Sequence, residues 1–309
     1  YLDKMGGAAV PVTRPDKTNP LPDMDEIDLE DLVRFFKNPF KAYYNKVLGI
    51  YYGDEQVLLS DTELFSLDSL QQWKLKNELL SETDSPALQA SLVKKGGLPL
   101  KNMAEVVLRQ VEEKVQPVRV LFAQATKDAA PQQISFELPL KKGSLKGILQ
   151  NVFDGKLVMV SWSGNETKYL VEAYIRYLAG MAAGVLSGLH FISGARKKAV
   201  FIALPLSQKE AKKRLVELIA VYKAGFESIA CFYPDFAIRP EQVEDLDAEK
   251  FAKLVNNKLN NSQFASDDPY IMTEYKYGYF DKEEALTGYQ SVCRLVIVPL
   301  VALFPGYYE

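Results

Sequence analysis

Two neighbouring apolar segments have the spacing of a metal-dependent phosphodiesterase site without its chemical groups. Such a site needs a carboxylate on one strand and an acid-x-Lys ending on the next, because hard divalent cations prefer oxygen ligands and a lysine helps to stabilise charge. The segments are LKGILQNVF (145–153) and KLVMVSWS (156–163). The acid positions hold Gln150 and Ser161, and the lysine position holds Ser163. The pair belongs to an active nuclease, to a former nuclease, or to an unrelated core.

The side chains at these three positions argue against cleavage. Gln150 could offer one carbonyl oxygen but brings no charge, Ser161 is a poor ligand for Mg²⁺, and Ser163 cannot supply a cation. The nearest acid, Asp154, precedes Gly155 and is expected in the turn between the two strands. We therefore expect no metal site and no catalytic residue here.

The rest of the chain offers little other catalytic chemistry. His190 is the one histidine, so a His-rich metal site is impossible, and its apolar neighbours are typical of a satisfied core histidine. Cys231 and Cys293 are too few for a metal cluster and are expected as buried thiols in a reducing compartment, which predicts a cytoplasmic protein. We find no Gly-rich phosphate loop, so ATP binding is not expected.

Composition bounds the partners that the chain can have. Its 309 residues are 48% hydrophobic and 25% charged, as expected of a soluble globular protein. The net charge of -3 is unlike that of a free-standing nucleic-acid binder, although a local basic patch is compatible with it. No apolar stretch is expected to reach the roughly 20 residues of a membrane span, so no membrane contact is predicted. The first residue is Tyr1 rather than Met, which predicts a piece of a longer protein.

The N-terminal part is predicted to be helical after a tail. Residues 1–25 are rich in Pro and Asp and predict a tail or linker, and residues 26–309 predict a single domain. Within it, residues 26–115 should be mainly short helices, at 29–37, 39–48, 68–80, 84–95 and 102–115. Asp28 is the expected N-cap of the first helix, Asn38-Pro39 should break it, and Gly49 should end the second.

Residues 116–309 are predicted to hold a sheet and its flanking helices. Strands are expected at 118–126, 133–140, 144–153, 156–162 and 197–206, with a hairpin turn at Gly143. A long helix should begin at Glu166, and others should span about 208–226, 241–260 and 281–303. Because helices and strands are interspersed in this order, the fold class is predicted to be α/β, a mixed sheet flanked by helices.

Two groups of residues could contact nucleic acid or a partner protein. Basic side chains gather at the hairpin turn and after residue 195, and these candidates for DNA contact are Lys141, Lys142, Lys146, Arg196, Lys197 and Lys198. The segment YIMTEYKYGYF is dense in aromatic residues and suits a strand edge or docking loop, with Tyr270, Tyr275, Tyr277, Tyr279 and Phe280 as interface candidates. Core packing would explain the same aromatic residues.

The order of several motifs resembles a known family. These are DLEDLVRFFKNPFKAYYNKVLGIYYG, LFSLDSLQQWKLKNELL, ELPLKKGSLKGILQNVF with LVMVSWS, EAYIRYLAGMAAG, SQKEAKKRLVELIAVYKAGFESIACFYP and YGYFDKEEALTGYQSVCRLVIVPLVAL. In this order they resemble the C-terminal domain of RecC, the gamma chain of bacterial exodeoxyribonuclease V. The resemblance covers nearly the whole chain after residue 25.

The resemblance implies a restriction-endonuclease-like core, similar to the nuclease domain of RecB, that has lost its catalytic residues. The domain would then be a non-catalytic scaffold in an ATP-dependent helicase–nuclease that repairs double-strand breaks. Its implied partners are RecD-type and RecB-type subunits and unwound DNA, forked or single-stranded, bound without regard to sequence. ATP and Mg²⁺ would belong to the partner subunits. Iron–sulfur relatives carry a cysteine where this chain has Asn38, so no cluster is expected.

Two alternatives stay open on the sequence. A divergent active DNA nuclease would use the same two strands, and carboxylates at positions 150 and 161 would have favoured it. A pure protein-interaction module would need no DNA contact, and a strongly positive groove would argue against it.

We expect the chain not to degrade DNA with Mg²⁺ or Mn²⁺, because Gln150, Ser161 and Ser163 replace the metal ligands and the lysine. The measurement is the release of acid-soluble nucleotides from linear DNA, compared with a mock-purified control. Cleavage above that control, abolished by alanine at the three positions, would show an active site.

Overall fold

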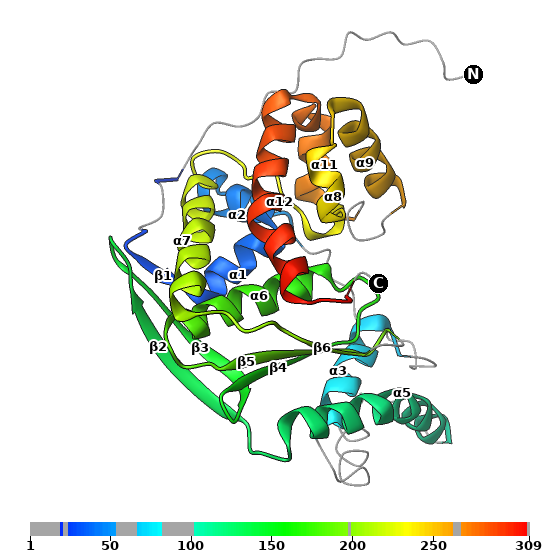
Figure 1. Cartoon of the computed structure of the whole chain (residues 1–309). Coiled ribbons are helices and arrows are strands. Elements are labelled where there is room, and N and C mark those ends of the chain that lie inside the picture. Colours follow the sequence, from blue (N-terminus) through cyan, green and yellow to red (C-terminus); the bar gives the residue numbers. More distant parts are fainter. Residues whose placement is uncertain are drawn as a thin grey trace, which may run out of the picture. The chain divides into compact units, whose positions relative to one another are not determined.

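The structure is a computed structural model that describes residues 19–20, 24–53, 67–81, 102–196, 199–261 and 267–307 (Figure 1). The chain divides into two compact units. Unit 1 comprises residues 1–52 and 216–299, and unit 2 comprises residues 53–215 and 300–309. Most of the predicted tail and the helix predicted at 84–95 lie outside the described residues, and the division into a tail and one domain stays a prediction.

Unit 2 contains a mixed sheet, as the sequence predicts. Its strands are β2 (Gln132–Pro139), β3 (Ser144–Phe153), β4 (Lys156–Ser161), β5 (Gly188–Ser193) and β6 (Val200–Ile202). β2 pairs with β3, and β4, β5 and β6 follow in that order. The β4–β5 pair is parallel, and the β2–β3, β3–β4 and β5–β6 pairs are antiparallel. The predicted class, an α/β fold with a mixed sheet flanked by helices, is confirmed.

Residues with positive φ form the two turns that connect β2, β3 and β4. Gly143 has a φ of 77°, and its carbonyl accepts the Leu140 N–H at 3.0 Å, which confirms the predicted hairpin turn. Asp154 and Gly155, with φ values of 49° and 75°, form the two-residue turn between β3 and β4. A two-residue turn with two positive φ angles matches the twist of the flanking strands, and Asp-Gly is a pair that favours these angles. Asp154 is therefore a turn residue.

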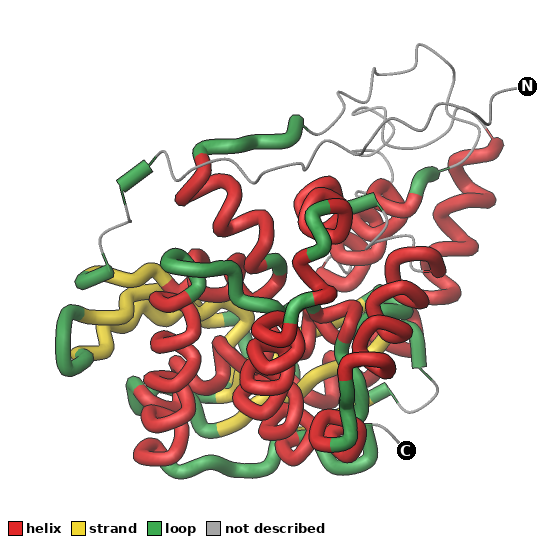
Figure 2. Tube along the Cα trace, turned by 90° about the horizontal axis from the view of Figure 1, so that it is seen from above, coloured by secondary structure: helices red, strands yellow, loops and turns green. Residues whose placement is uncertain are grey.

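A β-bulge separates the β2–β3 hairpin from the rest of the sheet. Gln132 lies opposite Val152 and Ile134 opposite Leu149, so two residues of β3 face one residue of β2. Asn151, in the bulge, has a φ of 57°. Because a bulge bends its strand, β3 pairs with β4 only at Val152–Leu157 and Phe153–Lys156. Beyond the bulge, β2 and β3 continue together to the Gly143 turn (Figures 1 and 2).

Two helices cover opposite faces of the sheet (Figure 1). α5 (Asn102–Thr126) packs Val118 against Val158 of β4 and Ile192 of β5. Val158 lies opposite His190, and Ile192 is two residues further along β5, so both point to the same face of the sheet. α6 (Thr167–Ala182) covers the other face. Gly180 allows α6 to pack closely here, since a Cβ would lie 2.3 Å from Leu186 Cδ1 and 2.8 Å from Leu149 Cδ1 of β3.

The strand predicted at 118–126 is wrong, because these residues form the second half of α5. Val115, Val118 and Phe122 recur at helical spacing and pack inward, which outweighs the β-branched composition of the segment. Pro117 lies inside the helix, where a proline removes one backbone hydrogen bond. Tertiary packing of the apolar face keeps the helix continuous.

β5 is absent from the sequence prediction. Its six residues begin at Gly188 and contain His190, so the apolar run is too short to tell a strand from a buried helical segment. The structure forms the strand because six residues pair in register with β4, from Lys156–Gly188 to Ser161–Ser193. β6 is shorter than the predicted 197–206 strand.

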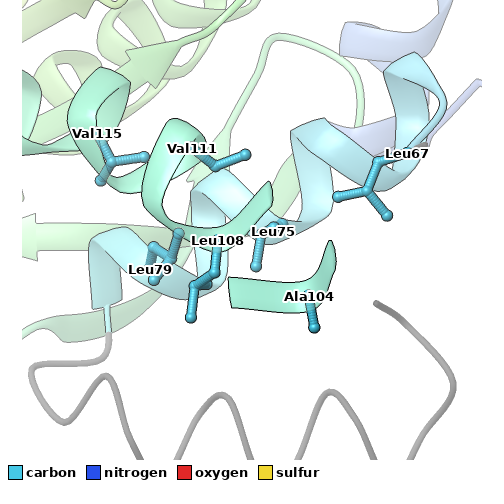
Figure 3. Close-up of a cluster of buried hydrophobic side chains, with 7 residues drawn as sticks. All are labelled: Leu67, Leu75, Leu79, Ala104, Leu108, Val111 and Val115. Atoms are coloured by element: carbon cyan, nitrogen blue, oxygen red, sulfur yellow. The ribbon is translucent and has the colours of Figure 1, made fainter. Parts of the chain in front are cut away.

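A second cluster of apolar side chains joins α3 (Ser69–Ser81) to the first half of α5. Figure 3 shows its buried members converging between the two helices: Leu67, Leu75, Leu79, Ala104, Leu108, Val111 and Val115. The helix predicted at 68–80 is thereby confirmed. The cluster anchors α3 to the helix that covers the sheet.

Unit 1 is mainly helical. It contains β1 (Glu26–Asp28), α1 (Leu29–Lys37), α2 (Pro39–Tyr43), a π-helical turn (Tyr44–Leu48), α8 (Pro240–Glu244), α9 (Ala248–Asn261) and α11 (Pro269–Lys276). 3₁₀ turns lie at Pro234–Phe236 and Tyr279–Asp281. α7 (Gln208–Ala224) begins in unit 2 and ends in unit 1, and α12 (Glu283–Leu303) runs from unit 1 into unit 2.

The predicted helix boundaries at the start of unit 1 are confirmed. Asp28 caps α1 by accepting the Glu30 N–H at 2.7 Å. Asn38 ends α1 and caps α2, since its Oδ1 accepts the Lys41 N–H at 2.9 Å. Gly49 ends the second helix in the left-handed conformation, with a φ of 67°.

α12 requires a correction to the expectation that no segment reaches membrane length. By length and composition it could cross a membrane, with a mean hydropathy of 1.6. A core helix of a water-soluble protein passes the same test, so one such helix is weak evidence. Within unit 1, α12 buries Tyr289, Cys293 and Val296 completely, and Arg294 forms a bidentate pair with Glu244 at 2.7 Å. These contacts are typical of a core helix.

We expect Gly180→Ala to destabilise unit 2 by about 1–3 kcal/mol, because the added Cβ would overlap Leu186 and Leu149 in a closely packed layer. The measurement is urea-induced unfolding. The control is Gly164→Ala, where a Cβ would meet no atom within 4 Å and stability should hardly change. Equal effects of the two substitutions would contradict this account of the packing.

Candidate nucleic-acid interface

The structure places the three predicted nuclease positions in different surroundings. Gln150 is exposed in the bulge of β3, Ser161 is buried at the end of β4, and Ser163 lies half-buried in the loop that follows. Ser161 Oγ accepts the Ser163 N–H at 3.3 Å, and Ser163 Oγ accepts the Asn165 N–H at 3.2 Å. The two hydroxyls therefore shape the loop between β4 and α6.

The neighbouring strand repeats this arrangement. Ser193 lies beside Ser161 in the parallel β4–β5 register. Its Oγ accepts the Ala195 N–H at 3.2 Å and the Arg196 N–H at 3.1 Å. At the carboxyl ends of both strands, serine side chains thus bind the backbone of turns, where a metal-dependent nuclease would place carboxylates.

Trp162 stabilises the same end of the sheet. Its ring lies against Gly194, where a Cβ would come within 2.4 Å of the indole, so only glycine allows this approach. The indole Nε1–H donates to Asn77 Oδ1 on α3 at 3.0 Å, and Lys76 Nζ lies 5.6 Å from the ring centroid. Tryptophan between two serines thereby connects β4, the loop after β5 and α3.

Within the described ranges, the structure contains no group of three or more His, Cys, Asp or Glu side chains placed to hold a metal ion. A divalent cation would need several oxygen ligands with negative charge. The end of β4 offers hydroxyl and backbone groups instead.

A buried carboxylate lies just beyond these strands. Glu166, whose side chain has no exposed surface, precedes α6 and faces the loop after β5. Its Oε2 accepts Arg196 Nε–H at 3.0 Å and the Tyr307 hydroxyl at 2.9 Å. Arg196 also lies over the Tyr307 ring, 3.8 Å from its centroid, and donates to the Tyr307 carbonyl. One buried charge thus joins three segments of unit 2.

This cluster changes the role of one predicted DNA-contact residue. Arg196 was expected to meet phosphate, but its guanidinium is committed to Glu166 and Tyr307 and only 39% of the side chain is exposed. The sequence marks Glu166 only as the start of a helix. Because Glu166 and Arg196 are 30 residues apart, no spacing in the sequence indicates that they form an ion pair. Lys197 and Lys198, the other candidates there, lie outside the described residues.

The hairpin lysines are more accessible than Arg196. Lys141 and Lys142 are exposed in the turn between β2 and β3. Lys146 pairs across the strands with Glu137 at 3.7 Å, so its charge is partly balanced. The pairs between β3 and β4 lie at the opposite end of β3 from this turn. The lysines therefore lie at the far end of the β2–β3 hairpin, and not beside Ser161 as the sequence suggested.

The aromatic segment 270–280 is helical, so the expected strand edge or docking loop is wrong. Tyr270 and Phe280 are buried in unit 1, where both pack against other aromatic rings. The Tyr279 hydroxyl donates to the Ile229 carbonyl at 3.0 Å. Tyr275 is exposed and donates to Asn256 at 2.6 Å, and Tyr277 is half-buried. Core packing therefore explains Tyr270 and Phe280, and Tyr275 and Tyr277 keep accessible surface.

Glu274, in the same helix, is another buried carboxyl group with a hydrogen-bond donor. The Tyr44 hydroxyl donates to Glu274 Oε1 at 2.8 Å, and the carboxylate is fully buried. Burial, and next the contact with Glu274, raise the pKa of Tyr44 far above its ordinary value. The phenol therefore remains a donor at all physiological pH values.

The chain's histidine is only partly as expected. His190 is half-buried on β5, and burial, followed by the charge of Lys156, lowers its pKa. Its Nδ1 is buried without a hydrogen-bond partner among the described residues, so it is not the satisfied core histidine that was predicted. The described residues around it give no nucleophile–base arrangement. Cys231 and Cys293 are buried free thiols, as expected, and burial raises the pKa of Cys293 to about 12.

Comparisons with known proteins point to one family. The family model of the RecC C-terminal domain matches residues 24–239, more than two thirds of the chain. The chain is similar to the RecBCD enzyme subunit RecC of Haemophilus influenzae, with 26% identity over 171 residues, 52% of this chain and 15% of that protein. The same subunit of Mycolicibacterium smegmatis is 30% identical over 173 residues, 53% of this chain and 15% of the relative. The RecC subunit of Buchnera aphidicola subsp. Acyrthosiphon pisum is 25% identical over 218 residues, which are 66% of this chain and 19% of the relative. The matches thus span less than a fifth of each relative.

We expect Glu166→Ala to lower the free energy of unfolding by about 2 kcal/mol, because it removes two hydrogen bonds to a buried charge. Urea-induced unfolding measures the change. The control is Glu249→Ala, which removes an ion pair between Glu249 and Lys253. These two side chains are 78% and 69% exposed, so the free energy of unfolding should fall by less than about 1 kcal/mol. Equal costs would mean that the buried cluster contributes no more than a surface pair.

Proposed function

The chain belongs to the RecC C-terminal domain family, and from that membership we propose that it is a non-catalytic scaffold domain of an ATP-dependent helicase–nuclease, exodeoxyribonuclease V. In this role it holds a helicase subunit and guides unwound DNA during the repair and recombination of double-strand breaks. Its core is a restriction-endonuclease-like sheet, similar to a RecB-type nuclease, without the catalytic groups.

The observation that carries this proposal is the chemistry at the end of β4. The two positions where a nuclease needs an acid and a lysine hold Ser161 and Ser163, whose hydroxyls bind the backbone of their own loop. The third position, Gln150, is neutral and exposed. The mixed sheet supports a nuclease-like core, and its polar groups serve the loops around it.

The partners follow from the names of the relatives. They are called RecC subunits of a RecBCD enzyme, which supports an assembly with RecB-type and RecD-type subunits. ATP hydrolysis and Mg²⁺-dependent cleavage are assigned to those subunits, and the site of action is the cytoplasm. The accessible aromatic side chains of unit 1, Tyr275 and Tyr277, are the candidates from the 270–280 segment for a protein contact.

DNA contact is assigned to the turn of the β2–β3 hairpin in unit 2. Lys141 and Lys142 are exposed at its tip, where a phosphate backbone can approach from solution. Lysine contacts with phosphate release counterions, so such binding is independent of sequence and weakens with salt. Lys146 contributes less because Glu137 shares its charge.

The test assembles the chain with purified RecB-type and RecD-type subunits and measures binding of forked DNA at several salt concentrations. We expect the subunits to be captured by the immobilised chain. We expect Lys141→Ala with Lys142→Ala to weaken DNA binding severalfold and to flatten the logarithmic salt dependence by up to about two units, one per lost contact.

The control for this test is Lys209→Ala with Lys212→Ala on α7, which removes the same charge from exposed positions elsewhere in unit 2 and should change neither quantity. Failure to capture either subunit would contradict the scaffold role. Capture with an unchanged salt slope would favour the pure interaction module. DNA degradation by the chain alone would favour the active nuclease.

A further inference from the structure

The one histidine of the chain, His190, lies in the middle of β5 and has no part in the proposed scaffold role. In the register of the sheet it lies opposite Val158 of β4 on one side and Ile202 of β6 on the other. It points to the same face as Ile192, the face that α5 covers. The imidazole is half-buried, and its Nδ1 is buried without a hydrogen-bond partner among the described residues.

The unpaired nitrogen suits a neutral imidazole. In the neutral tautomer with its proton on Nε2, Nδ1 is an acceptor and carries no hydrogen. Protonation turns Nδ1 into a buried N–H donor without an acceptor, and it places a positive charge between apolar side chains of β4 and β6. The surroundings of His190 in the folded sheet therefore oppose its protonation.

The charged groups of the neighbouring elements act in the same direction. Lys156 of β4 points to the face of His190, since it lies two residues before Val158, and its positive charge acts on the imidazole. Burial first, and Lys156 second, lower the pKa of His190 below its ordinary value.

None of the elements packed on this side of His190 offers a carboxylate that could stabilise an imidazolium. β4, β5 and β6 contain no Asp or Glu. The part of α5 that covers the face, residues 115–126, has Arg119 as its one charged residue, and Arg119 donates to the Leu79 carbonyl. The nearest acids along the chain, Asp128 and Asp154, are exposed beyond the ends of these elements.

β6 is the strand on which a charge at His190 would act. It comprises three residues, Val200–Ile202, which pair with His190–Ile192 of β5. The Ala203 N–H donates to the Leu189 carbonyl at 3.0 Å. Because hydrogen-bonded and non-hydrogen-bonded pairs alternate along an antiparallel ladder, the adjacent His190–Ile202 pair is of the second kind, in which side chains lie closest. The imidazole is therefore a direct neighbour of a short strand with few hydrogen bonds.

β6 in turn contacts the C-terminal segment of unit 2. The rings of Phe201 and Tyr307 have centroids 4.8 Å apart, and the Leu204 N–H donates to the Leu303 carbonyl at 2.9 Å. The Tyr307 hydroxyl donates to Glu166. A change in the attachment of β6 thus reaches the segment that the buried carboxylate holds.

We infer that the charge state of His190 controls how firmly β6 is attached to the sheet, so that mild acid loosens β6 and the C-terminal segment that packs on it. The neutral ring allows the β5–β6 pairing, and the protonated ring weakens it. This property goes beyond the scaffold role and does not depend on it, because it resides in the sheet of unit 2 alone.

The direction of the pH dependence follows from linkage between protonation and folding. The pKa of His190 is lower in the folded sheet than its ordinary value of 6.5, so a detached or unfolded β5 binds the proton more tightly. The stabilisation by the neutral ring is therefore fully present above pH 6.5. It is lost progressively as the pH falls below 6.5 through the lower folded value.

The first experiment titrates His190 by NMR in the full 309-residue chain, purified without a histidine tag. A single histidine gives a single Cε1–H signal, so its midpoint belongs to His190 alone. We expect a midpoint below 6.5, and a higher midpoint in Lys156→Met, which keeps the ring and removes the like charge. The control Lys209→Met, at an exposed position on α7, should leave the midpoint unchanged. A wild-type midpoint at or above 6.5 overturns the inference.

The second experiment locates the effect by amide hydrogen exchange at pH 7.5 and pH 5.0, with protection factors corrected for the intrinsic rate at each pH. The protection factor of the Ala203 amide should fall at least threefold at pH 5.0. The amide of Ala183, which donates to the Ala179 carbonyl at the end of α6, is the internal control and should change less than 1.5-fold.

His190→Gln removes the titrating group and keeps a polar side chain, so the fall at Ala203 should disappear. Lys156→Met should reduce the fall without removing the histidine, and this variant keeps the inference testable if His190→Gln does not fold. Equal falls at Ala203 and Ala183 would mean a general loss of stability in acid. A threefold fall that persists in His190→Gln would assign the effect to another group. Either result overturns the inference.

Discussion

The buried charge of Glu166 constrains how unit 2 is built. A carboxylate without contact to water must be paired, and Glu166 is paired with Arg196 and the Tyr307 hydroxyl. These partners come from the loop after β5 and from the C-terminal segment, so the position of both depends on one carboxylate at the start of α6. The N-terminal end of that helix favours the negative charge as well.

Other polar side chains of unit 2 also serve the loops around the sheet. At the ends of β4 and β5, Ser161 and Ser193 stabilise turns through side chain–backbone hydrogen bonds, and Trp162 fills the space above Gly194. A metal site would need several carboxylates whose positions are fixed by hydrogen bonds from neighbouring side chains. Here the hydrogen bonds of Ser161 and Ser193 stabilise loops, and Arg196 pairs with the nearby buried acid, Glu166.

The two units differ in the contacts that they offer. In unit 2, Lys141 and Lys142 are exposed in the turn of the β2–β3 hairpin. In unit 1, Phe35, Tyr222 and Phe226 pack in the core beside Arg34 and Asp31, and two of the three ring pairs are edge-to-face.

The sequence by itself determined the features that depend on neighbouring residues. Asp28, Asn38 and Gly49 fix the helix ends because capping and left-handed turns are local, and Gly143 and Asp154-Gly155 fix the strand turns for the same reason. The absence of acidic and basic side chains at positions 150, 161 and 163 can be read from the sequence directly, because it depends on residue type alone. The tertiary structure decided what depends on distant partners. Residues 118–126 became helical because their apolar face packs on the sheet, and β5 formed because β4 pairs with it. Arg196 became a structural cation because Glu166 lies close to it although the two are far apart in the sequence, and sequence spacing carries no record of such proximity.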